Sequence, residues 1–123
     1  MTGCPCGFGE PYETCCGRYH RGKAQPPTAV TLMRARYTAF ARGEERFLAD
    51  TWHPSTRPSG PLLDPALDWT ALHVTGHTGG GLLDDTGTVA FTARYLRDGV
   101  PGRMRENSRF VRLDGRWRYL AAA

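Results

Sequence analysis

The chain has 123 residues, of which 40% are hydrophobic and 23% are charged, the composition of a soluble globular protein with one sizeable core. No run approaches the roughly 18 apolar residues of a membrane span. The N-terminus lacks the apolar stretch of a signal peptide, so we expect a cytoplasmic protein without membrane contact. The net charge is +4, which permits contact with nucleic acid or acidic partners, but no basic run is interleaved with stacking aromatic residues.

The cysteines set the N-terminal segment apart from the rest of the chain. All four lie between Cys4 and Cys16, and Gln25-Pro26-Pro27 then forms a short, stiff linker. We therefore predict a small cysteine-containing unit over residues 1–25 and a larger domain over residues 26–123.

Two helices are predicted after the linker. From Ala29 to Arg42 the apolar residues recur at spacings of three and four, with Thr28 as the N-cap and Gly43 as the C-cap. A second, shorter helix is predicted from Glu44 to Trp52. It should end at His53-Pro54, because a proline disfavours helical conformation in the residue before it.

The second half of the chain has the pattern of strands. After a proline-rich loop, four runs are predicted as strands: Asp68–Thr78, Thr88–Arg97, Arg103–Leu113 and Arg116–Leu120. The first is rich in threonine and valine, and apolar residues alternate along the second. Asp114-Gly115 between the last two runs is a signal for a two-residue hairpin. Helices followed by a four-strand meander predict an α+β fold, with the helices on one face of an antiparallel sheet.

The cysteine spacing is the strongest chemical signal. Cys4 and Cys6 are separated by one residue, and Cys15 and Cys16 are adjacent. A structural zinc ion is held by four soft ligands in a tetrahedron. Each cysteine pair can supply two thiolates, and Gly7 gives the intervening loop the freedom to fold around an ion. The spacing therefore predicts a zinc knuckle.

Other readings of this cluster remain open from the sequence. Two disulfides or four free thiols are the alternatives, and His20 could replace one cysteine as a ligand. A site closed by four thiolates leaves no position for water or substrate, so we expect a structural and not a catalytic role for the zinc.

The residues also resemble a known family. The blocks Cys4-Pro5-Cys6-Gly7 and Cys15-Cys16-Gly17 resemble the SEC-C motif, a small zinc knuckle. The downstream blocks resemble the bacterial YchJ-like proteins; they are Leu32–Phe40, Thr51–Ser55, Phe91–Tyr95 and Glu106–Phe110. The resemblance implies a SEC-C knuckle followed by a cone-shaped α+β domain similar to nuclear transport factor 2, with helices packed on a curved, cystatin-like antiparallel sheet. Some members carry a second SEC-C motif at the C-terminus, whereas this chain has no cysteine after Cys16.

Cone-shaped domains of this type often enclose a pocket, which would give a second site. The predicted lining residues are Arg36, Tyr37, His53 and Glu106. Arg36 and Glu106 could form a buried ion pair between helix and sheet, or act in anion binding or proton transfer. His53 could act as a general base, or cap the second helix through its ring.

Three functions follow as hypotheses. The first is a non-enzymatic zinc adaptor, in which the knuckle and its basic flank (Arg18, Arg21 and Lys23) dock on a protein or ribosomal partner. The alternative is a small-molecule binder or enzyme that uses the cone pocket. RNA binding through surface arginines is the third, and we also expect that the open face of the sheet could pair two copies as a homodimer.

Overall fold

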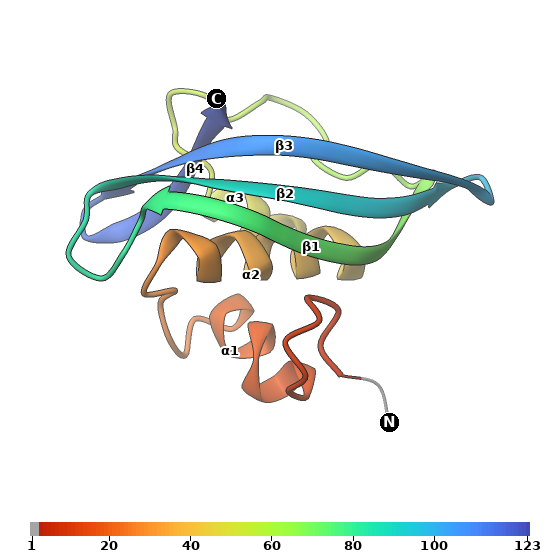
Figure 1. Ribbon diagram of the computed structural model, residues 1–123, viewed down its shortest axis with the longest axis horizontal. Helices are drawn as coiled ribbons and strands as arrows, with labels where there is room; N and C mark the ends of the chain where they lie inside the picture. Colours follow the sequence, from red (N-terminus) through yellow and green to blue (C-terminus); the bar gives the residue numbers. More distant parts are fainter. Residues whose placement is uncertain (1–2) are drawn as a thin grey trace.

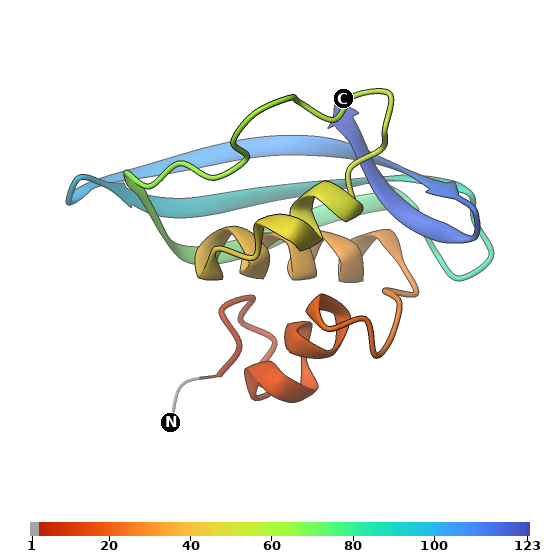
Figure 2. The same cartoon turned by 180° about the vertical axis from the view of Figure 1, so that it is seen from behind.

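The computed structural model describes residues 3–123, so Met1 and Thr2 of the predicted unit 1–25 lie outside the described residues. Its elements are η1 (Tyr12–Thr14), α1 (Cys16–His20), α2 (Ala29–Arg42), α3 (Glu45–Asp50), β1 (Leu67–Gly79), β2 (Thr86–Arg97), β3 (Val100–Leu113) and β4 (Arg116–Ala122). They form three layers: the sheet, then α2 and α3, then the N-terminal segment with α1 (Figure 1). The view from behind shows the same order, with α2 between the sheet and α1 (Figure 2).

The four strands form an antiparallel meander in the order β1-β2-β3-β4. The predicted hairpin at Asp114-Gly115 is confirmed, since both residues have positive φ, 55° and 77°, as a two-residue turn of this type requires. Asp98-Gly99 turns β2 into β3 in the same way, with φ of 50° and 83°, so β3 begins at Val100, earlier than predicted. Bulges after Trp69 and Val74 interrupt the pairing of β1 with β2.

Helix α2 has the predicted bounds, Ala29–Arg42, and the predicted caps. The Thr28 hydroxyl accepts a hydrogen bond from the Thr31 amide at 3.2 Å, and Gly43 adopts the left-handed conformation with φ of 82°. Ala35 and Ala39 are fully buried, and their small side chains allow the neighbouring layers to approach the helix closely.

Helix α3 is shorter than predicted, because it ends at Asp50 and not at Trp52. The backbone beyond it pairs with β4: the Tyr119 amide donates to the Thr51 carbonyl at 2.8 Å, and the His53 amide donates to the Tyr119 carbonyl at 2.8 Å. This pairing draws residues 51–53 out of helical geometry and brings Trp52 against Tyr119.

The buried residues form one continuous core, which includes the cysteine cluster and the side chains packed between α2 and the sheet. Fully buried Leu32, Leu48, Val89 and Phe110 lie at its centre. None of the helices within residues 3–123 has both the length and the apolar character needed to cross a membrane.

Candidate functional site

The four cysteines come together on the side of α2 that faces away from the sheet. Cys4 and Cys6 belong to a tight turn in which the Gly7 amide donates to the Cys4 carbonyl at 3.0 Å. Gly7 has a positive φ of 81°, which a residue with a side chain rarely adopts. Cys15 and Cys16 lie where η1 gives way to α1. All four sulfur atoms are within 4.8 Å of one another, and all four side chains are buried.

The distances between the sulfur atoms fit a bound cation better than a disulfide. All four cysteines are free thiols. The Cys6 and Cys15 sulfurs are 3.7 Å apart, whereas a disulfide bond is about 2.05 Å long. A tetrahedron with Zn–S distances of about 2.3 Å has edges of about 3.8 Å. The four cysteines therefore form a candidate metal site.

The four thiols of the cluster differ in how readily they ionise. The hydrogen bond from the Cys16 thiol lowers the pKa of Cys6 to about 5, so one sulfur is readily ionised. Burial raises the pKa of Cys15 to about 12, and donation to Cys6 is the main reason that the pKa of Cys16 is raised. Without a cation the cluster thus favours a single negative charge, and four thiolates require a compensating positive ion.

Helix α2 supplies polar contacts to the cluster. The hydroxyl of Thr38, which is fully buried, donates to the Cys16 sulfur at 3.2 Å and lies 3.6 Å from the Cys4 sulfur. Arg34 donates to the Cys6 carbonyl at 3.0 Å. Contacts of this kind orient metal ligands and tune their affinity.

His20 is not part of the cluster, which corrects the expectation that it could replace a cysteine. Its Nε2 donates to the Ala35 carbonyl at 2.8 Å, and its Nδ1 accepts from the Tyr12 hydroxyl at 2.7 Å. Both ring nitrogens are thereby occupied, and the ring also packs on Phe47. Burial lowers the pKa of His20, so this histidine is a neutral residue that fastens α1 to α2.

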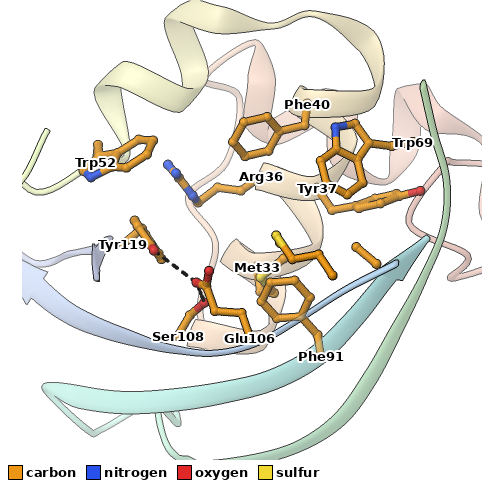
Figure 3. A pocket seen from close by; sticks show the side chains of 12 residues that line it. Met33, Arg36, Tyr37, Phe40, Trp52, Trp69, Phe91, Glu106, Ser108 and Tyr119 are labelled. Atoms are coloured by element: carbon orange, nitrogen blue, oxygen red, sulfur yellow. Dashed lines mark hydrogen bonds between the residues drawn. The ribbon is translucent and has the colours of Figure 1, made fainter. Parts of the chain in front are cut away.

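A cavity of about 240 Å³ lies on the opposite side of α2, against the concave face of the sheet. Its lining is mostly aromatic and apolar, with one cation and one carboxylate (Figure 3). The lining residues are Met33, Arg36, Tyr37, Phe40, Trp52, Trp69, Phe91, Ala93, Met104, Glu106, Ser108 and Tyr119.

Arg36 is the buried cation of this cavity. Only 3% of its surface is exposed, and burial lowers its pKa to about 9, so it remains protonated at neutral pH. One guanidinium nitrogen donates to the Leu48 carbonyl at 3.0 Å and to the Thr51 hydroxyl at 2.7 Å. The Arg36 guanidinium also stacks between the rings of Trp52 and Tyr119, 4.8 Å from each centroid.

Glu106 is the carboxylate, and it does not form the ion pair with Arg36 that we considered from the sequence. Within residues 3–123 the structure contains three salt bridges, and none joins these two side chains. Instead, one oxygen of Glu106 accepts hydrogen bonds from Ser108 and from the Tyr119 hydroxyl, the latter at 3.0 Å. Tyr119 contacts both charged groups, because its ring lies against the Arg36 guanidinium and its hydroxyl donates to Glu106 (Figure 3). Burial, followed by the nearby carboxylate, raises the pKa of Tyr119 to about 12, which keeps it a donor.

The structure places the other two predicted pocket residues differently. Tyr37 lines the cavity, with its pKa raised to about 12 by burial. His53 lies outside the cavity, and it does not cap α3 either. Its Nδ1 accepts from the amide and hydroxyl of Ser55, which closes the turn that follows α3. The backbone of His53 is held at this place by its hydrogen bond to Tyr119 of β4.

Sequence reasoning missed the connecting role of Tyr119. The signal was available, since the Asp114-Gly115 hairpin pairs Tyr119 with Phe110. Alternation along β3 then places Ser108 and Glu106 on the same face as Phe110. The contribution of Trp52 could not be found in this way, because it depends on the pairing of the loop after α3 with β4.

Residues 28–122 match the family model described as YchJ, middle NTF2-like domain. The chain belongs to the YchJ-like family. It is 49% identical over 117 residues to a UPF0225 protein of Streptomyces avermitilis, covering 95% of this chain and 81% of the relative. It is 50% identical over 118 residues to a UPF0225 protein of Corynebacterium efficiens, covering 94% of this chain and 88% of the relative.

Two solved structures share the fold over almost the whole chain. One is the solution structure of a SEC-C motif containing protein from Rhodopseudomonas palustris, with a TM-score of 0.84, 30% identity and coverage of 99% of this chain and 98% of that one. The other is the crystal structure of a SEC-C motif containing protein from Psychrobacter arcticus, with a TM-score of 0.78, 26% identity and coverage of 98% and 81%. The predicted family and the nuclear transport factor 2-like α+β fold with an N-terminal cysteine knuckle are therefore confirmed.

Proposed function

We propose that this chain is a zinc-stabilised ligand-binding protein, in which the four cysteines hold one structural Zn²⁺ and the cavity accepts a small molecule. The observation that carries the proposal is the cavity itself: an apolar space of about 240 Å³ with a buried arginine that no carboxylate contacts within the described residues. Pockets of this character are the usual sites of small ligands.

The zinc would act on the fold and not on a substrate. Four thiolates complete its coordination, so no position is left for water or substrate. Bound between the Cys4–Cys6 turn and the start of α1, the ion would fix the knuckle against α2, the same helix that carries Arg36 into the cavity. The cysteines thereby support the cavity from the other side of the helix.

The zinc part is tested by metal analysis of the purified protein. We expect one Zn²⁺ per chain, bound with the release of protons as the thiols ionise. Substitution of both Cys15 and Cys16 by serine should abolish this binding, whereas substitution of the solvent-exposed Thr14 by serine should not. A protein that folds without zinc at full stability would refute the structural role.

The ligand-binding part is tested by thermal denaturation with a small neutral aromatic probe, toluene. Binding to the native state alone raises the melting temperature with increasing ligand concentration. Phe91→Trp, which adds volume to the floor of the cavity, should reduce that rise relative to the unaltered chain. If toluene leaves the melting temperature unchanged, the cavity does not bind apolar molecules of this size.

A second candidate function is the zinc adaptor, and the exposed ring of Phe8 favours it. This side chain is 65% exposed in the loop between the two cysteine pairs, where it lies 5.9 Å from the Arg34 guanidinium. A partner that covered Phe8 would bury apolar area on a loop whose shape the metal site holds. Purified ribosomes are one partner to test, by co-sedimentation. The adaptor proposal predicts binding that is lost in Phe8→Ala and in the double cysteine variant, and unchanged sedimentation of both would contradict it.

A further inference from the structure

The cavity contains two opposite charges that face the same space without pairing. Arg36 comes from α2 and Glu106 from β3, and the structure holds each by other partners. Opposite charges attract strongly in an apolar environment, so a direct pair would be the expected arrangement if the two groups served only to neutralise one another. Their separation is therefore the feature to be explained.

Arg36 has unused hydrogen-bonding capacity. A guanidinium carries five N–H groups, and both protein hydrogen bonds of Arg36 come from the same nitrogen atom. In the described part of the chain, Trp52 Nε1 is the only side-chain nitrogen or oxygen that is both sealed from solvent and unpaired. The other two guanidinium nitrogens of Arg36 are unpaired as well, so they are not sealed from solvent. Because Arg36 lines the cavity, their N–H groups can donate to an anion there.

Only one of the two carboxylate oxygens of Glu106 accepts hydrogen bonds from the described residues. Both of its hydrogen bonds, from Ser108 and Tyr119, end on the same carboxylate oxygen, Oε2. The second oxygen accepts no hydrogen bond from residues 3–123, so it can accept one from a ligand. The Tyr119 hydroxyl donates its one proton to Oε2, so it has no proton left to donate to a ligand.

The rest of the lining is apolar and has the shape of a ring-binding space. Phe40 and Tyr37 pack near Trp69, with ring centroids 6.3 Å from the Trp69 ring in both cases. An apolar cavity of about 150 Å³ holds benzene, so the 240 Å³ of this cavity accommodates one six-membered ring and a few further atoms.

We infer that the cavity binds a zwitterionic α-amino acid with an aromatic side chain, its carboxylate on Arg36, its ammonium group on Glu106 and its ring against Phe40 and Trp69. The inference rests on the proposed ligand-binding function and adds the class of ligand. A purely anionic ligand would meet the carboxylate of Glu106, and a purely cationic ligand would meet Arg36. A molecule that carries both charges pairs with both side chains at once.

The test uses the zinc-loaded full chain and three probes that differ by one group. L-Phenylalanine carries both charges, 3-phenylpropanoate lacks the ammonium group, and 2-phenylethylamine lacks the carboxylate. Each missing charge-assisted hydrogen bond should weaken binding about tenfold to hundredfold by titration calorimetry. Equal or tighter binding of 3-phenylpropanoate or of 2-phenylethylamine would overturn the inference.

Variants assign the two ends of the ligand. Glu106→Gln should weaken L-phenylalanine about tenfold or more and should not weaken 3-phenylpropanoate, whose binding should tighten because the repelling carboxylate is gone. Arg36→Lys should weaken both of these probes. Should Arg36→Lys fail to fold, the comparison of the three probes on the unaltered chain decides the matter. Binding of toluene without L-phenylalanine would overturn the zwitterion and leave the ligand cavity standing. Binding of no probe at all would overturn both.

Discussion

Thr38 connects the cysteine cluster to α2, and its replacement by valine isolates that connection. The side chain is fully buried, and its hydroxyl lies 3.2 Å from the Cys16 sulfur and 3.6 Å from the Cys4 sulfur. Valine has nearly the same shape and lacks the O–H donor. The change therefore removes one hydrogen bond to a sulfur atom while the packing around residue 38 is kept.

Two independent estimates give the size of the effect. A hydroxyl has one proton, so Thr38 donates to one sulfur, and a hydrogen bond to a charged group contributes about 1.5–3 kcal/mol. Loss of a contact that orients a metal ligand typically costs tenfold to hundredfold in metal affinity, which corresponds to about 1.4–2.8 kcal/mol. We therefore expect Thr38→Val to weaken zinc binding by about tenfold to hundredfold.

The assay is competition for Zn²⁺ against a chelator of known affinity at constant pH. Thr38→Ser is the matched control, because it keeps the hydroxyl and loses only a methyl group, at a stability cost of about 1 kcal/mol. Its zinc affinity should stay close to that of the unaltered chain. The reasoning would be refuted by a Thr38→Val protein that binds zinc within threefold of the unaltered chain, or by a serine variant that is equally weak.

Two further predictions concern the joints of the fold. Burial lowers the pKa of His20 below its usual 6.5, so the unfolded chain binds a proton at this ring more readily than the folded chain does. The stability that neutral His20 contributes is therefore fully present above about pH 6.5. It is lost as the pH falls through the lowered pKa. Urea unfolding at pH 7.5 and 5.0 should show a gap between the unaltered chain and His20→Gln that shrinks at the lower pH, and a constant gap would contradict this. Gly87→Ala would place a Cβ 2.5 Å from the Cα of Gly80. The Gly80 carbonyl accepts a hydrogen bond from the Ala29 amide at the start of α2, so the clash would disturb this joint. Overpacking of this kind lowers the free energy of unfolding by about 1–3 kcal/mol. Gly76→Ala, where a Cβ meets nothing within 4 Å, should stay within about 0.5 kcal/mol in the same urea measurement; equal effects of the two changes would count against the close contact.

The sequence by itself determined the features that depend on near neighbours in the chain. Thr28 and Gly43 set the two ends of α2, because a side-chain cap and a left-handed residue act within one helical turn. Asp114-Gly115 set the last hairpin, since a two-residue turn depends on its own φ angles. The cysteine spacing likewise predicted a cluster, and the structure brings the four sulfur atoms within 4.8 Å.

Only the tertiary structure decided what the charged side chains do. Arg36 and Glu106 share the cavity without pairing, because Thr51 accepts from the guanidinium while Tyr119 of β4 donates to the carboxylate. That arrangement requires the loop after α3 to pair with a strand more than sixty residues later, which also turns His53 away from the cavity. The local sequence cannot predict such a contact, because the free energy that stabilises it comes from burying aromatic rings of distant segments against one another.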